Sequence, residues 1–142
     1  HGSEILRLAD TDGDGRADAR EVLLSGFGIQ DSHLLPHRFL RAPDGGIYTA
    51  QGAFNHSAVV DRSGRVTPFE QCKLARFRED GSRFEVIGVG LNNIWGIVFD
   101  ERGEFLVQEA NDLGFGVAPF VFGATYPGIG GHRFRPYAPV QP

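Results

Sequence analysis

The acidic segment DTDGDGRADARE, residues 10–21, carries the densest chemistry in the chain. When Asp10 is counted as position 1 of a twelve-residue EF-hand loop, Gly15 falls at the sharp turn of position 6 and Glu21 at position 12, which supplies a bidentate carboxylate. Ca²⁺ prefers about six to eight hard oxygen ligands. The expected ligands are the side chains of Asp10, Asp12, Asp14, Asp18 and Glu21 and the backbone carbonyl of Arg16. The spacing therefore predicts a calcium site.

The alternative interpretation of this segment is an acidic surface turn that holds no ion. Carboxylates this close together repel one another unless a cation lies between them, which favours the calcium interpretation. Only nine residues precede the loop, and Gly26 interrupts the segment after it, so we do not expect the two helices of a calcium sensor. We expect a structural calcium loop that pins a connection between strands.

The rest of the chain consists mainly of short apolar or alternating runs separated by glycine turns such as Asp44-Gly45, Asp80-Gly81 and Arg102-Gly103. The clearest element is the segment 73–89, KLARFREDGSRFEVIGV, in which a polar Asp-Gly turn joins two alternating runs. This pattern predicts an all-β fold.

A weak internal repeat relates RFLRAPDGGIYTAQG (38–52) to GIVFDERGEFLVQEA (96–110). In both copies an apolar strand leads into a polar glycine turn and a second apolar strand. Such units are typical of β-propeller blades, and we interpret residues 1–142 as a single unit with two to three blades. Because a closed propeller needs about four to eight blades, further chain segments are expected to complete the ring. Hairpins of a β-sandwich are the alternative.

Composition excludes several classes of function. The net charge is −4 and the basic residues are scattered, which argues against nucleic acid as a partner. No apolar stretch is long enough for a membrane span. The one cysteine, Cys72, excludes an internal disulfide and a CxxCH haem site, and we expect it to be a small buried residue. The absence of methionine indicates a processed chain or a piece of a longer one.

Three segments together resemble a known family: LADTDGDGRADAREVLLSGFG (8–28), DSHLLPHRFLRAPDGGIYTAQGAFNHS (31–57) and GLNNIWGIVFDERGEFLVQEA (90–110). The chain resembles, over residues 3 to about 112, the secreted β-propeller proteins of planctomycetes and verrucomicrobia identified as membrane-bound or sorbosone-type dehydrogenases. The chain is also distantly similar to the soluble quinoprotein sugar dehydrogenases.

The resemblance implies a periplasmic or secreted propeller that binds pyrroloquinoline quinone, oxidises a carbohydrate or polyol, and passes electrons to a c-type cytochrome. It implies a histidine base shortly before the APDG turn at 42–45, for which His33 is the first candidate and His37 the second. The cofactor segment corresponds to GLNNIWGI (90–97), with Asn92, Asn93 and Trp95 as the candidate contacts. Asn92 stands where the family has an arginine that pairs with a cofactor carboxylate.

Two alternatives to the dehydrogenase remain open. One is a non-catalytic, calcium-stabilised module that binds glycans or proteins, with Trp95, Tyr48 and Phe54 as a stacking platform or as core residues. The other is a metal-dependent lactonase-type propeller, for which Glu109, Asn111 and Asn93 could supply ligands.

Overall fold

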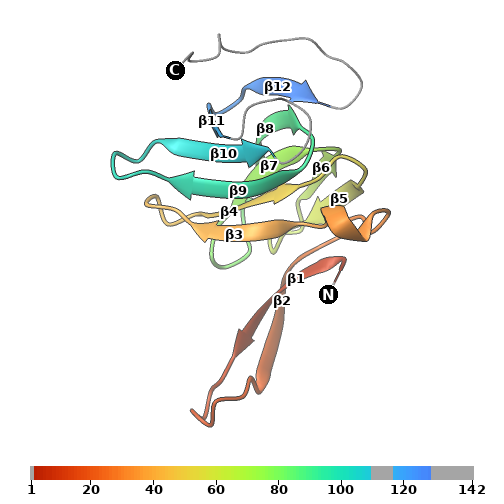
Figure 1. Cartoon of the computed structure of the whole chain (residues 1–142). Helices are drawn as coiled ribbons and strands as arrows, with labels where there is room; N and C mark the ends of the chain where they lie inside the picture. Colours follow the sequence, from red (N-terminus) through yellow and green to blue (C-terminus); the bar gives the residue numbers. More distant parts are fainter. Residues whose placement is uncertain (1, 110–116, 129–142) are drawn as a thin grey trace.

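The computed structural model describes residues 2–109 and 117–128, and the part of the chain it describes is built from strands and one short 3₁₀ helix (Figure 1). The predicted all-β class is therefore confirmed. The elements are β1 (Glu4–Ala9), β2 (Ala19–Ser25), η1 (Ser32–Leu34), β3 (His37–Arg41), β4 (Ile47–Gln51), β5 (His56–Val60), β6 (Val66–Glu70), β7 (Lys73–Phe77), β8 (Glu85–Leu91), β9 (Ile94–Phe99), β10 (Phe105–Glu109), β11 (Ala118–Pro119) and β12 (Thr125–Gly128).

The strands form three sheets. The five-stranded sheet has the order β12-β8-β7-β4-β3, the four-stranded sheet β1-β2-β5-β6, and the three-stranded sheet β11-β10-β9. Two core clusters use alternate residues of the five-stranded sheet, so that Leu74 belongs to one cluster and Ala75 to the other. The first cluster includes Ile97 and Val107 of the three-stranded sheet. The second includes Leu24, Val59 and Phe69 of the four-stranded sheet, so the five-stranded sheet is the middle layer.

The hairpin predicted over residues 73–89 is present as β7 and β8, which pair antiparallel with a register shift between Leu74 and Ala75. Both halves of the predicted repeat are also antiparallel hairpins, β3–β4 and β9–β10. Each turns at a glycine with positive φ, Gly45 in one and Gly103 in the other, a conformation that costs glycine little. The two hairpins belong to different sheets.

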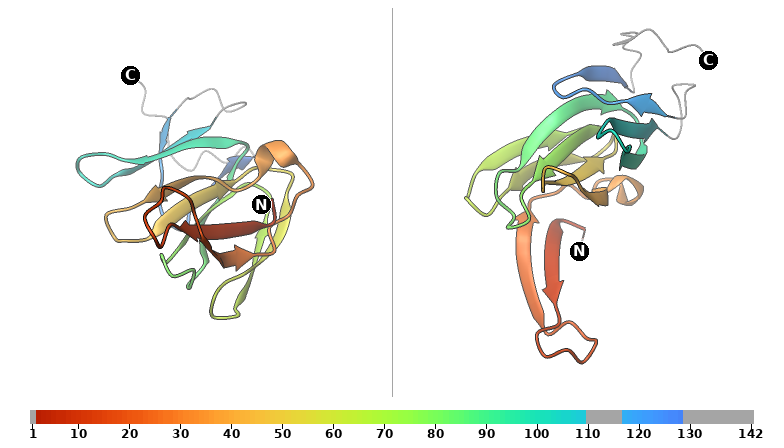
Figure 2. Two further views of the ribbon diagram at one scale, coloured as in Figure 1. Left: turned by 90° about the horizontal axis from the view of Figure 1, so that it is seen from below. Right: turned by 90° about the vertical axis from the view of Figure 1, so that its left-hand side faces the viewer.

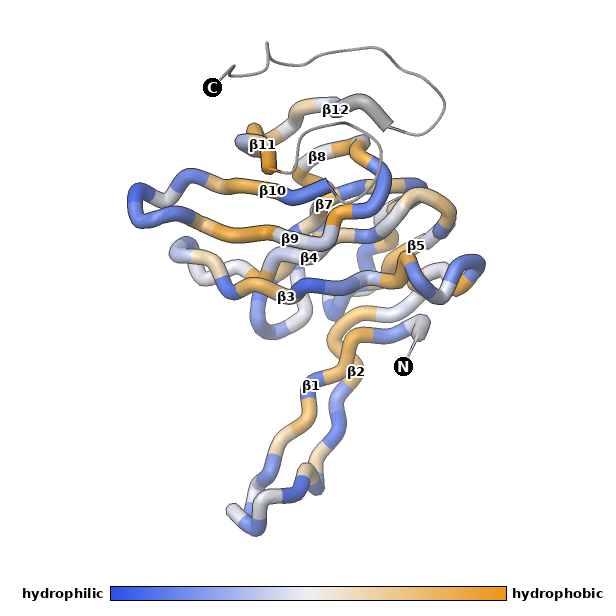
Figure 3. Tube along the Cα trace, in the orientation of Figure 1, coloured by the Kyte–Doolittle hydropathy of each residue, from blue (hydrophilic) through white to orange (hydrophobic). Residues whose placement is uncertain are grey.

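The hairpin β1–β2 extends away from the body of the molecule (Figures 1 and 2). Apolar residues lie where it meets the body, whereas its far end is hydrophilic (Figure 3). Leu24 is 1% exposed at the body end, and the loop between Ala9 and Ala19 is exposed throughout. The acidic segment therefore sits at the tip of a projecting hairpin.

Within the described ranges, no helix has the length and apolar character needed to cross a membrane.

Candidate calcium loop and histidine site

The acidic loop is shaped by hydrogen bonds from its own backbone to its carboxylates. The two oxygens of Asp10 accept from the N–H groups of Gly13 (2.7 Å) and Gly15 (2.8 Å). Asp12 and Asp14 each accept from the N–H two residues further on, at 3.2 Å and 2.8 Å. These local bonds curl the chain, and the positive φ angles of Gly13 and Gly15 allow the sharp reversals.

The curled loop brings three of the predicted ligands together. One oxygen from each of Asp10, Asp12 and Asp14 lies within 4.8 Å of the others, and all three residues are exposed. The hydrogen bond from Gly15 is the largest influence on Asp10 and keeps the pKa of this carboxyl below its ordinary value. Asp10 is therefore ionised near neutral pH, as a ligand of a hard cation has to be.

Asp18 and Glu21, which are also predicted ligands, are not part of this cluster. Asp18 accepts hydrogen bonds from the N–H (3.0 Å) and hydroxyl (2.7 Å) of Thr11, and the hydroxyl bond is the largest cause of its lowered pKa. Arg16 is exposed, and its N–H donates to Asp14.

Glu21 lies in β2, and two arginines engage its carboxylate. One of its oxygens pairs with Arg7 of β1 and the other with Arg62, which lies in the turn between β5 and β6. Since both oxygens are engaged, Glu21 has to leave the two arginines before it can bind a cation in the bidentate manner of position 12.

His33 is the more available of the two candidate bases. It lies in η1, its side chain is 90% exposed, and its Nδ1 lies 3.2 Å from Oδ1 of Asp31. The same Asp31 oxygen accepts from the N–H of His33 at 2.9 Å. With Nδ1 protonated and donating to Asp31, Nε2 is left as an acceptor open to solvent.

His37 lies in a different environment. Its Nδ1 is 2.7 Å from the carbonyl of Leu35, and its Nε2 contacts the carbonyl of Ile94 in β9. The imidazole also packs on Trp95, with ring centroids 5.2 Å apart. No nitrogen of His37 is left to accept a substrate proton, so its role is to join β3 to β9, and it does not fit the role of base.

The residues expected to hold a quinone lack the arginine that the resemblance implies. Asn92 is 4% exposed and replaces a cation with a neutral amide. Asn93 donates its backbone N–H to Glu109 at 3.3 Å, and Trp95 is 53% exposed over His37. Nothing in this segment replaces the charge-assisted contact that the cofactor's carboxylate would lose, so residues 92–95 do not fit the anionic quinone.

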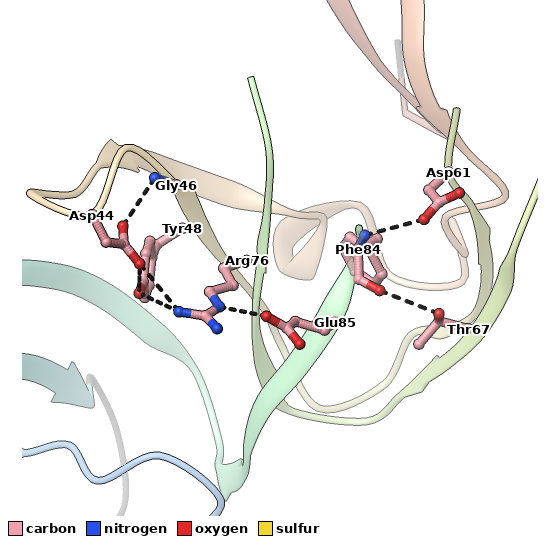
Figure 4. A network of polar contacts seen from close by, with 8 residues as sticks. All are labelled: Asp44, Gly46, Tyr48, Asp61, Thr67, Arg76, Phe84 and Glu85. Carbon is pink, nitrogen blue, oxygen red and sulfur yellow. Dashed lines mark hydrogen bonds and ion pairs between the residues drawn. The ribbon is translucent and has the colours of Figure 1, made fainter. Parts of the chain in front are cut away.

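The residues of the other two hypotheses are only partly assembled. Glu109 is buried beside Asn93, whereas Asn111 lies outside the described residues. The stacking platform is wrong for Tyr48, because this ring is 2% exposed within the core, while Phe54 and Trp95 are exposed. The Tyr48 hydroxyl donates to Asp44 at 2.9 Å, in a network that Arg76 extends to Glu85 (Figure 4).

Sequence reasoning missed a buried polar network at the end of β4. Gln51 and Asn55 are both 0% exposed, and Ser57 is 5% exposed. The hydroxyl of Ser57 donates to Gln51 at 2.6 Å, and the side chain of Gln51 donates to the carbonyl of Asn55 at 3.0 Å. The signal available in the sequence was the close spacing of the amide and hydroxyl residues at 51, 55 and 57.

Comparison with known proteins gives a family and nothing nearer. No curated protein and no solved structure matches the chain significantly. The family model described as "Domain of unknown function (DUF7133)" matches residues 1–125, which is most of the chain. The chain belongs to this family.

Proposed function

We propose that this protein is a calcium-binding β-module in which the loop from Asp10 to Glu21 holds one Ca²⁺. The observation that carries the proposal is the convergence of Asp10, Asp12 and Asp14 within 4.8 Å, at the spacing of an EF-hand loop. Asp18 and the Arg16 carbonyl follow at the next ligand positions. Glu21 completes the set once it leaves Arg7 and Arg62.

The role of the ion is structural. The loop joins two strands and is flanked by no helix in the described ranges, so binding orders the tip of a hairpin and moves no helix pair. Affinities of about 10⁻⁴ to 10⁻³ M are common in extracellular modules. This range suits a secreted or periplasmic location, which we propose for the protein.

Thermal unfolding with and without calcium tests this role. At calcium concentrations about 10 to 100 times Kd, binding to the folded state alone adds about 1.4–2.7 kcal/mol and raises Tm by several degrees. We expect this rise for the unaltered chain and its loss in Asp12→Asn combined with Asp14→Asn. The control is Asp100→Asn, which alters an exposed turn carboxylate outside the loop. An equal calcium shift in the double variant would remove the loop from the proposal.

We further propose that the module belongs to a β-propeller. The support is the antiparallel order β3-β4-β7-β8, with β9 and β10 beginning a second sheet beside it. Four antiparallel strands are the size of one propeller blade, and a closed ring needs further blades.

A second function, oxidation of a carbohydrate or polyol hydroxyl, is favoured by the pair of His33 and Asp31. An imidazole held at Nδ1 by a carboxylate presents Nε2 as a base that can take a hydroxyl proton. The hydrogen on the same carbon would leave as hydride to a two-electron acceptor held by the full-length parent protein, which would pass the two electrons on to a c-type cytochrome, the partner that the resemblance implies. Because residues 92–95 do not fit the quinone, we assign no step to that cofactor.

Dye reduction by the full-length parent protein, assayed on a panel of sugars and polyols, tests the second function. His33→Ala should abolish turnover, whereas His56→Ala, at another exposed histidine, should leave it intact. Full turnover of the His33 variant would exclude this residue as the base.

A further inference from the structure

The buried side-chain amide of Asn55 forms hydrogen bonds with the turn that contains His33. Its Oδ1 accepts from the N–H of Asp31 at 2.9 Å, and its Nδ2 donates to the carbonyls of Asp31 (3.1 Å) and Leu34 (2.7 Å). Asn55 is 0% exposed. These contacts span 21 to 24 residues of sequence and tie the start and the end of the turn to one rigid point.

Asn55 is itself held in place by its neighbours. Gln51 donates to the carbonyl of Asn55 at 3.0 Å and to that of Phe69 at 2.8 Å. The turn that contains His33 is also attached at Gly52, whose N–H donates to the carbonyl of Leu34 at 3.1 Å. A methyl group at Gly52 would lie 2.5 Å from the Leu34 side chain, so this side chain packs directly against the backbone of Gly52.

The pair that this anchor supports would be weak on its own. His33 is 90% exposed, and an exposed ion pair or hydrogen bond between mobile side chains contributes little. The backbone of Asp31 is fixed at both its N–H and its carbonyl by Asn55, and the Asp31 carboxylate lies within hydrogen-bond reach of the imidazole. The buried side-chain amide of Asn55 therefore keeps the exposed pair of Asp31 and His33 in a fixed geometry.

We infer that Asn55 is a positioning residue that fixes Asp31 so that His33 is held as the Nδ1–H tautomer with Nε2 directed to solvent. This inference rests on the proposed role of His33 as a base. It has a consequence that needs no substrate, because the tautomer can be observed in the free protein.

The test is the tautomeric state of His33 in the ¹⁵N-labelled full chain, read from long-range ¹H–¹⁵N correlations at a pH where the ring is neutral. We expect the Nδ1–H form in the unaltered protein and a shift to the Nε2–H form in Asp31→Asn, Asn55→Ala and Asn55→Asp. Asn55→Asp keeps the shape and the acceptor but loses both donors. Val59→Ala removes buried volume elsewhere and should leave the tautomer unchanged.

Hydrogen exchange of the Asp31 amide in the unaltered protein gives a reading that does not depend on how the variants fold. We expect this amide to be protected, because its acceptor is buried. An unprotected amide, an Nε2–H ring in the unaltered chain, or an Nδ1–H ring retained in a folded Asn55 variant would overturn the inference. If the tautomer and hydrogen-exchange results are as expected but the protein does not oxidise sugars, only the second proposed function is contradicted.

Discussion

Asp61 and Asp100 occupy turns that share two backbone hydrogen bonds but differ in burial. Each accepts from the backbone N–H groups two and four residues further on. Asp61 is 4% exposed and also accepts from the N–H of Phe84 at 3.2 Å, whereas Asp100 is exposed. We expect Asp61→Asn to lower the free energy of unfolding by about 1–3 kcal/mol. Asp100→Asn should cost no more than about 0.5 kcal/mol, and urea denaturation at pH 7 checks both values.

The Asp61 carboxylate also predicts how the free energy of unfolding depends on pH. Burial is the largest influence on Asp61 and raises its pKa, but hydrogen bonds from Ser63, Phe84 and Arg65 outweigh it and leave the pKa below 3.8. A lowered pKa means that the contribution to stability is present above about pH 4 and is lost as the pH falls through the folded-state value. The difference between the unaltered chain and Asp61→Asn should therefore shrink below about pH 4. A difference that grows on acidification would contradict this account.

Cys72 is expected to be inert in the folded protein. Its side chain is buried, and desolvation is the main cause that raises the pKa of its thiol to about 12, with Glu109 adding to the effect. Since the thiolate is the reactive form, a chromogenic disulfide reagent at pH 8 should react at least about a hundredfold more slowly with the native chain than with the chain in urea. Fast labelling of folded protein would show that the thiol is accessible.

At the scale of elements, Arg62 links Glu21 of the proposed calcium loop to the turn between β5 and β6. It pairs with Glu21, which has to leave it to bind Ca²⁺. Arg62→Gln should therefore strengthen calcium binding by up to about 1 kcal/mol, or about fivefold in Kd, because exposed ion pairs contribute little more than this. Arg65→Gln, an exposed arginine of the same turn, is the matched control and should leave Kd unchanged. Equal affinities for all three chains would show that Arg62 does not compete with the ion.

A structural feature could be predicted from the sequence where the residues that produce it lie close together in the chain. The β7–β8 hairpin and the clustering of Asp10, Asp12 and Asp14 follow from spacings within a few residues, and both appear in the structure. The engagement of Glu21 by Arg62 joins residues far apart in the chain, so nothing in the ligand spacing could indicate it. Asn55 was missed for the same reason, because its partners lie more than twenty residues earlier.

At the scale of the whole molecule, the two cores share the five-stranded sheet and should unfold together. Phe84 lies in one cluster and Ile97 in the other, at 0% and 1% exposure. We expect Phe84→Ala to cost about 3–5 kcal/mol and Ile97→Ala about 2–5 kcal/mol, each within a single cooperative transition. Calorimetry checks this expectation, and two separate transitions would contradict the interpretation of the chain as one unit.

Calcium titration tests the central claim most directly. The full chain, stripped of metal with EDTA and transferred to chelator-free buffer, should bind one Ca²⁺ in isothermal titration calorimetry, with Kd of about 10⁻⁴ to 10⁻³ M. The double variant Asp12→Asn and Asp14→Asn should give no binding signal, and Asp100→Asn should titrate like the unaltered chain. Absence of binding to the unaltered chain up to about 10 mM calcium, well above the Kd range of such modules, would contradict the claim that the loop at the tip of β1–β2 is a calcium site.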